Sequence, residues 1–272
     1  MAHPQQFCFV QTFANHISAS DSQFNILEIG SYDVNGSVRE LFPGSTYCGV
    51  DLTPGEGVDV VADGHRVDHP NNSYDITISC ECFEHNPAWL ETFHNMYRMT
   101  KAGGFIVVTC ATTGRVEHGT RRTTPKASPG TQQQGWDYYR NIPVAHFRKL
   151  MNFDEMFQDH RFFTNTISHD LYFVGRKHGA DVDLTFDLTR FSSEHADAQR
   201  ALEQKLAEER SGVGNALMHV YRATQWPVQA LTFLPEPVFQ TFAVYYNKAV
   251  MGLVRPVEAT LRRVMRVGPP VN

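Results

Sequence analysis

The chain has 272 residues, of which 42% are hydrophobic and 19% charged, and its formal net charge at pH 7 is −5. This composition excludes a wholly disordered chain and provides enough apolar residues for a substantial core. A small negative net charge also argues against a protein that binds nucleic acid over its whole surface by electrostatics.

The cysteines and the N-terminal residues predict a cytoplasmic protein. Five cysteines without the spacing of a disulfide framework indicate free thiols in a reducing compartment. The first residues, MAHPQQFCFVQTF, lack the basic and apolar regions of a secretory signal. The longest apolar stretch, residues 238–254, is interrupted by polar residues and is too short to span a membrane.

Five short apolar runs in the first half are typical of strands in a buried parallel sheet. They are rich in Val, Ile, Tyr and Phe and span residues 24–30, 46–52, 58–63, 74–80 and 103–110. Helical spacing over residues 36–42 and 86–100 separates them, and Lys-Ala-Gly-Gly ends the second of these segments. This alternation predicts a doubly wound α/β sheet.

Residues 111–141 interrupt the alternation. They are rich in Thr, Gln, Gly, Arg and Pro and have no periodicity, which predicts a long loop or lid after the fifth strand. A helix over residues 143–152 and two strands over 161–168 and 171–176 follow, the strands forming a hairpin at the sheet edge. The predicted sheet then has seven strands, mostly parallel.

The composition changes after about residue 178. We predict a charged helix over residues 193–210, an aromatic region over 215–254 that is broken at its prolines, and a basic amphipathic helix over 254–266. The sheet domain is therefore assigned to residues 1–178, and residues 179–272 to a helical accessory region. This region is expected to form a homo-oligomer contact or cover the substrate, or to contact a membrane surface weakly through the basic C-terminal tail.

The segment ILEIGSYDVNG, residues 26–36, predicts a ligand site because it connects a strand to a helix, where open α/β sheets bind ligands. A dinucleotide motif needs a glycine where Tyr32 stands. Glu28 would repel a pyrophosphate but attract an ammonium group. Asp51 follows at about 20 residues, the position of the carboxylate that binds ribose hydroxyls in such folds. Asp63 and the glycine after it end the third strand, where an adenine edge is read.

The segments ILEIGSYDVNG, YCGVDL, VVADGH, NSYDITISCECFEH and MTKAGGFIVVTC resemble, in order and spacing, the class I S-adenosylmethionine-dependent methyltransferases of the small-molecule type. The resemblance is close over about residues 24–110 and loose to residue 178. It implies a Rossmann-like methyltransferase fold, S-adenosylmethionine as cofactor and S-adenosylhomocysteine as product. It further implies that the cofactor is bound by Glu28, Gly30, Gly36, Asp51, Leu52, Asp63, Gly64, Cys80 and Glu81.

An alcohol acceptor must lose a proton, and histidine is the side chain best matched to that task at neutral pH. His85, just after the fourth strand, is the first candidate base, and His118 in the long loop is the second. The same loop carries five basic against two acidic residues, which favours an acceptor with a phosphate or carboxylate. The predicted substrate-binding residues are Arg121, Arg122, Tyr139 and Arg140.

We therefore predict O-methylation of a hydroxyl on a small anionic or sugar-like acceptor. The fourth strand lacks the Asn/Asp-Pro-Pro-aromatic run of methyltransferases that act on nucleobases, and no nucleic acid partner is expected. A nicotinamide-dependent oxidoreductase and a non-catalytic cofactor-binding scaffold stay open as alternatives.

Cys80, Cys82 and His85 form a C-x-C-x-x-H pattern, but zinc would need a fourth ligand and no second compact Cys/His pair follows. No bound metal is therefore predicted, although a loosely bound divalent ion that assists deprotonation stays open.

Overall fold

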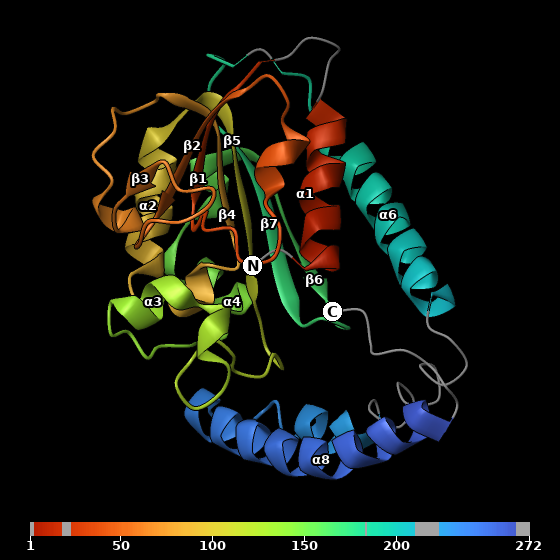
Figure 1. Cartoon of the computed structure of the whole chain (residues 1–272). Coiled ribbons are helices and arrows are strands. Elements are labelled where there is room, and N and C mark those ends of the chain that lie inside the picture. Colours follow the sequence, from red (N-terminus) through yellow and green to blue (C-terminus); the bar gives the residue numbers. More distant parts are fainter. Residues whose placement is uncertain (1–2, 18–22, 183, 210–222, 265–272) are drawn as a thin grey trace. The chain divides into compact units, whose positions relative to one another are not determined.

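A computed structural model describes residues 3–17, 23–182, 184–209 and 223–264. The chain divides into two compact units, residues 1–200 and residues 201–272. The first unit contains a seven-stranded sheet with helices on both faces, and the second is helical (Figure 1).

The sheet has the strand order β3-β2-β1-β4-β5-β7-β6. Strands β1 to β5 pair in parallel, and β7 runs antiparallel to both β5 and β6. The prediction of a doubly wound, mostly parallel sheet of seven strands that ends in a hairpin is confirmed. Its strands are β1 (Asn25–Ile29), β2 (Thr46–Asp51), β3 (Val60–Val61), β4 (Tyr74–Cys80), β5 (Thr100–Ala111), β6 (Phe157–Asn165) and β7 (Asp170–Lys177).

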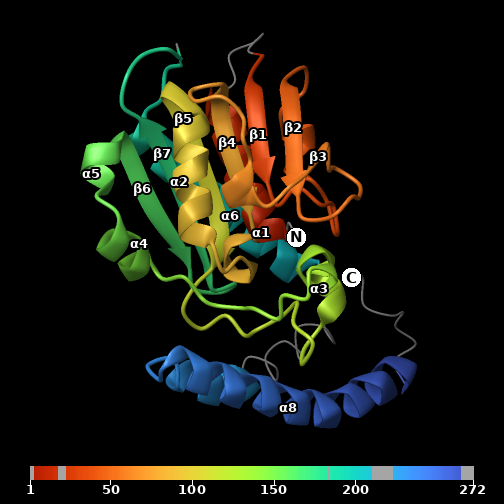
Figure 2. The same ribbon diagram turned by 90° about the vertical axis from the view of Figure 1, so that its left-hand side faces the viewer.

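Helices cover the two faces of this sheet separately (Figure 2). One face carries α2 (Trp89–Met99), α4 (Val144–Leu150) and α5 (Phe153–Met156). The other carries α1 (Pro4–Ile17) and the first part of α6 (Leu188–Glu208). Both faces are therefore removed from water, which explains why the strands have continuous apolar runs instead of alternating polar residues.

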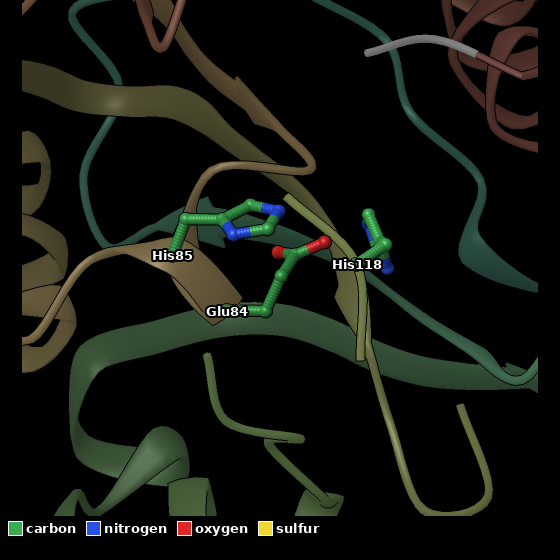
Figure 3. Close-up of side chains that lie close together, drawn as sticks. All are labelled: Glu84, His85 and His118. Carbon is green, nitrogen blue, oxygen red and sulfur yellow. The ribbon is translucent and has the colours of Figure 1, made fainter. Parts of the chain in front are cut away.

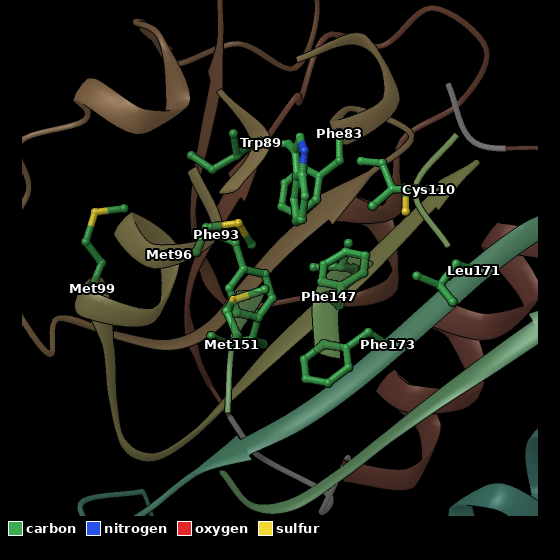
Figure 4. Close-up of a cluster of buried hydrophobic side chains, with 14 of the residues drawn as sticks. Phe83, Trp89, Phe93, Met96, Met99, Cys110, Phe147, Met151, Leu171 and Phe173 are labelled. Carbon is green, nitrogen blue, oxygen red and sulfur yellow. The ribbon is translucent and has the colours of Figure 1, made fainter. Parts of the chain in front are cut away.

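Strand β5 shows how the two faces divide the core. Ile106 and Val108 belong to the hydrophobic cluster under α2, whereas Phe105 and Val107 belong to the cluster under α1. Successive side chains of a strand point to opposite faces, so one strand supplies both clusters. Figure 4 shows the first cluster, in which the rings of Phe93 and other aromatic residues pack against the sheet.

Several elements of the first unit differ from prediction. Residues 36–42 form only a 3₁₀ turn, η1 (Val38–Leu41), because Ser37 caps its start and Pro43 follows the C-cap residue Phe42. Helix α6 begins earlier than predicted, because the Asp187 side chain accepts the backbone N–H of Thr189 and of Arg190, at 2.9 Å each. Helix α1 was not among the predicted elements.

The loop predicted over residues 111–141 contains two short helical segments, η4 (Pro125–Ala127) and α3 (Pro129–Gln133). Pro129 stands at the first position of α3, where a helix has no need of a backbone donor.

The second unit contains a helical segment at residues 223–230 and the long helix α8 (Glu236–Val264). Two expectations for this unit are wrong. Two of the prolines predicted to break a helix do not: the helical segment at residues 223–230 continues through Pro227, and Pro237 lies in the first turn of α8. Residues 254–264 also do not form a separate helix, since α8 continues through Pro256.

The basic tail, on which the predicted membrane-surface contact rests, lies almost entirely outside the residues whose side chains are described. Among the described helices, none combines the length and apolarity needed to cross a bilayer.

Candidate active site

A pocket of about 660 Å³ opens at the carboxyl ends of β1, β2 and β4. This is the edge at which open α/β sheets bind ligands, and the volume lies in the range of small-molecule sites. The pocket brings together residues from the first three strand ends, from the end of β4 and from the loop after β5. Its wall includes Gly30, Asp51, Leu52, Asp63, Gly64, Glu81, Cys82, His85 and Trp136, together with residues 127–131.

The turn after β1 approaches its neighbours closely. Gly30 has a φ of +86°, which favours glycine, and the backbone N–H groups of Gly30 and Ser31 donate to the Val50 carbonyl at 2.8 and 3.1 Å. A Cβ atom on Gly30 would lie 2.6 Å from the Cβ of Cys82. The turn therefore requires glycine at this position both for its backbone conformation and for space.

Glu28 lies in β1, two residues before Gly30. A smaller pocket of about 250 Å³, which shares Gly30 with the larger one, is lined by Glu28, Gly36 and Cys80. The Glu28 carboxylate is 5% exposed and accepts a hydrogen bond from the Tyr47 hydroxyl at 2.9 Å. Burial raises the pKa of Glu28 to about 7.

Asp51 ends β2 with its carboxylate at the pocket. One oxygen accepts the backbone N–H of Tyr32 at 3.1 Å and the other accepts that of Leu52 at 2.7 Å. Burial raises its pKa, and these backbone donors work in the opposite direction. Asp63, at the end of β3, contacts the His65 ring nitrogen Nδ1 at 2.7 Å.

Part of the long loop forms the pocket wall over Asp51. A Cβ atom on Gly130 would lie 2.8 Å from Oδ1 of Asp51, so α3 rests against this carboxylate. The Gln134 side chain donates to the Leu52 carbonyl at 3.2 Å, and the Gln132 side chain donates to the Gly119 carbonyl at 2.8 Å. The long loop therefore supplies part of the pocket wall, and its role as a lid stays a prediction.

Both candidate bases belong to what we term the histidine cluster, Glu84, His85 and His118, of which only His85 is among the lining residues of the larger pocket. Glu84 and His85 come from the 3₁₀ turn η3 (Phe83–His85), and His118 comes from the long loop. One ligand-type atom from each lies within 4.8 Å of the others. Figure 3 shows the three side chains close together, and the two imidazole rings pack edge to face with their centroids 5.0 Å apart.

The polar atoms of the histidine cluster are poorly satisfied. Glu84 is fully buried, and neither of its carboxylate oxygens has a hydrogen-bond partner. Nδ1 of His85 is likewise buried without a partner, whereas Nδ1 of His118 donates to the Val116 carbonyl at 3.3 Å. Burial lowers the pKa of His85 well below its ordinary value and that of His118 to about 3, so both rings are neutral at pH 7.

Beside this cluster lies a second group of buried charges that the sequence did not reveal. Asp170 contacts Nε2 of His3 at 3.1 Å and the Arg115 guanidinium at 3.1 Å. Glu81 has a φ of +49°, and its Oε1 is buried without a partner. Burial and the neighbouring Glu84 and Asp170 carboxylates raise the pKa of Glu81 well above its ordinary value.

The predicted substrate-binding residues are divided between two places. Tyr139 packs with its ring centroid 5.3 Å from that of His85 and 5.0 Å from that of His118. Arg122 instead forms a two-point ion pair with Glu117, with one contact at 2.8 Å. Arg121, Arg122 and Arg140 are exposed and are not among the lining residues of the pocket. Their role stays a prediction.

Comparison with known proteins gives one family match. Residues 27–108 match the family described as "Methyltransferase domain". No protein of curated function matches the sequence.

Several solved structures are similar in fold, at low sequence identity. The YcgJ protein of Bacillus subtilis is 11% identical, with 63% of this chain and 99% of that one covered and a TM-score of 0.44. A Burkholderia thailandensis 1,6-didemethyltoxoflavin-N1-methyltransferase, solved with S-adenosylhomocysteine, is 13% identical, with coverages of 65% and 80% and a TM-score of 0.44. A Mesorhizobium loti S-adenosylmethionine-dependent methyltransferase is 12% identical, with coverages of 61% and 96% and a TM-score of 0.39. At these values none of the three carries an inference about the acceptor.

The matched residues run from β1 into β5 and include the tight turn at Gly30 and the carboxylates that end β2 and β3. They lie on the mostly parallel seven-stranded sheet that the resemblance implies. Residues 27–108 thus match a methyltransferase domain, in agreement with the resemblance to class I S-adenosylmethionine-dependent methyltransferases.

Proposed function

We propose that this protein transfers a methyl group to a hydroxyl of a small, polyhydroxylated acceptor. The observation that carries the proposal is that one pocket is lined by residues from both groups of predicted site residues. Its wall runs from Asp51, the carboxylate predicted to bind the ribose, to His85, whose Nδ1 is buried without a partner. An acceptor bound beside the cofactor would therefore contact a neutral imidazole in which Nδ1 accepts no hydrogen bond from the protein.

The residues present fit S-adenosylmethionine. Asp51 would bind the ribose hydroxyls, Asp63 and Gly64 the adenine, and the turn at Gly30 the amino-acid part. Glu28 supplies the strongest test of fit, because it is a buried carboxylate and no ion pair to it occurs among the described residues. A cationic group in the smaller pocket would provide the missing charge.

The bound cofactor supplies a sulfonium-activated methyl group, so transfer forms an O–C bond, breaks the C–S bond and leaves S-adenosylhomocysteine. The protein must then place the hydroxyl in line and accept its proton. His85 accepts that proton at Nδ1 as the oxygen attacks and then returns it to solvent. Tyr139 and His118 pack against the His85 ring and fix its orientation.

The charges around this end of the pocket favour a hydroxylated acceptor. Glu81 lines the pocket, and Glu84 lies directly behind His85. Carboxyl groups, ionised or protonated, form hydrogen bonds with sugar hydroxyls but offer no cation to an anionic group placed beside them. A phosphate or carboxylate on the acceptor would accordingly extend outward to the exposed Arg121 and Arg140.

The test is transfer of a labelled methyl group from S-adenosylmethionine to a pool of hydroxylated metabolites, with mass spectrometry to locate the label. We expect an O-methyl ether. His85→Ala should lower the rate by roughly 10²–10⁴-fold while S-adenosylhomocysteine still binds. His94→Ala, which removes an exposed histidine from α2, serves as the matched control.

A label found on nitrogen, carbon or sulfur would contradict O-methylation. Cofactor binding without transfer to any pool would favour the scaffold alternative.

A further inference from the structure

We propose that Glu84, His85 and His118 bind a divalent first-row transition-metal ion at the acceptor end of the pocket. This metal site is not part of the cofactor site and goes beyond methyl transfer itself. It also differs from the C-x-C-x-x-H pattern, because the cluster takes His85 from that pattern but neither Cys80 nor Cys82.

The three side chains are already gathered as ligands. Each offers one ligand atom, and these atoms lie within 4.8 Å of one another (Figure 3). Ligands to one ion sit at roughly 2.0–2.2 Å from it for imidazole nitrogen and carboxylate oxygen, so a small inward movement of the side chains completes the site. His118 is half-buried, which gives an ion a path to the otherwise buried Glu84 and His85.

The imidazole rings are oriented as ligating histidines usually are. A histidine that binds a metal typically donates its other ring N–H to a carbonyl or carboxylate. His118 donates Nδ1–H to the Val116 carbonyl, which leaves Nε2 for an ion. His85 donates to the backbone of Tyr138, and its Nδ1 is the buried nitrogen without a partner. Each ring therefore presents one lone pair.

Charge supplies a second, independent reason. Glu81, Glu84 and Asp170 are three buried carboxyl groups in one region, and Arg115 is the guanidinium that pairs with Asp170. Buried carboxylates without compensation are costly, and the two Glu84 oxygens have no hydrogen-bond partner. A divalent cation at Glu84 would stabilise the ionised form of this buried carboxyl group.

The ligand set selects the kind of ion. Two imidazoles and one carboxylate suit zinc, iron, cobalt or manganese, whereas magnesium and calcium prefer oxygen ligands alone. Three protein ligands also leave a coordination position open, and because His85 lines the pocket, that position is accessible to an acceptor hydroxyl. His85 would then hold the ion in the loaded protein and accept the proton directly in the ion-free protein.

The experiment measures metal binding without cofactor or acceptor. Full-length protein is treated with EDTA, dialysed and titrated with Co²⁺, whose visible absorption reports coordination, and with Zn²⁺ by calorimetry. We expect one ion per chain, with affinity at least about 10-fold lower in Glu84→Gln and in His118→Gln. Both substitutions preserve approximate volume, and thermal unfolding verifies that the variants fold.

Two control variants distinguish this site from other sources of binding. His94→Ala removes an exposed histidine, and His3→Ala removes a ligand from the second cluster of ligand-type residues, which also includes Glu81 and Asp170. We expect neither to change the affinity. Loss of binding in His3→Ala but not in His118→Gln would place the ion in the other cluster and overturn the proposal. Equal binding by all variants, or none by the parent, would overturn it too, while O-methyl transfer could still be observed.

Discussion

Replacing Asp51 by asparagine tests the cofactor site with a change of one atom and one charge. Both carboxylate oxygens already accept backbone N–H groups, from Tyr32 at 3.1 Å and from Leu52 at 2.7 Å. The amide keeps only one acceptor oxygen and turns its NH₂ group toward one of these backbone donors. Asp51→Asn should therefore lose a hydrogen bond to the turn as well as the charge offered to a ligand.

The expected loss of affinity follows from hydrogen-bond energies. A bond to a charged group contributes roughly 1.5–3 kcal/mol, and a neutral one roughly 0.5–1.5 kcal/mol. A ribose diol would make two bonds of the first kind with Asp51, and the asparagine could keep one of the second kind. Since Asp51 is partly exposed, we expect a loss of about 2–4 kcal/mol, or roughly 30- to 700-fold in Kd.

Isothermal calorimetry with S-adenosylhomocysteine measures this change directly. Asp68→Asn is the control, because it removes an exposed aspartate from a nearby part of the chain and should leave Kd unchanged. The thermal midpoint must be compared for all three proteins. If Asp51→Asn bound the product within about threefold of the parent at an unchanged midpoint, the assignment of Asp51 to the ribose would be refuted.

Three further predictions concern Glu28, Gly30 and His195. Because burial raises the pKa of Glu28 to about 7, affinity for S-adenosylhomocysteine should rise from about pH 6 to about pH 8 as the carboxyl group ionises. Calorimetry should show this step vanishing in Glu28→Gln. Gly30→Ala should lower the free energy of unfolding in urea by at least about 1 kcal/mol, because of its positive φ and the contact with Cys82; an equally stable variant would contradict this. Burial lowers the pKa of His195 to about 4 in the folded protein. As the pH falls below about 6.5, the unfolded chain binds a proton at this histidine before the folded protein does, so the free energy of unfolding should fall by about 3 kcal/mol by pH 4. His195→Leu should flatten that part of the urea-derived stability profile, and parallel profiles would argue against it.

The sheet could be predicted because its central parallel strands, β1, β4 and β5, are buried on both faces. That burial leaves continuous apolar runs, and β4 and β5 appear in the sequence almost at their observed bounds. Residues 36–42 have helical spacing too, but a cap at Ser37 and the proline after Phe42 limit them to one 3₁₀ turn. Helix α1 does carry a local signal, since Phe9, Phe13 and Ile17 repeat at a spacing of four.

The candidate site was predictable only where sequence order fixes position. Gly30, Asp51 and Asp63 follow strands that run in parallel, and the carboxyl ends of such strands meet at one edge. His3 and Asp170 offered no comparable signal, because they come from segments far apart in the chain and meet only through packing of α1 beside β7. Glu84 was visible beside His85, but its lack of a partner is a property of the folded core.

The close contact between Gly130 and the Asp51 carboxylate connects the two ends of the pocket. Any ligand that uses that carboxylate must either displace α3 or be covered by it, because there is no room between them for a single extra carbon. The Gln132 side chain ties the same helix to Gly119, the neighbour of His118. If the cofactor and acceptor bind as proposed, filling the half at Asp51 would be transmitted through this helix to the half at His85, which favours an obligatory order of entry with the nucleoside first.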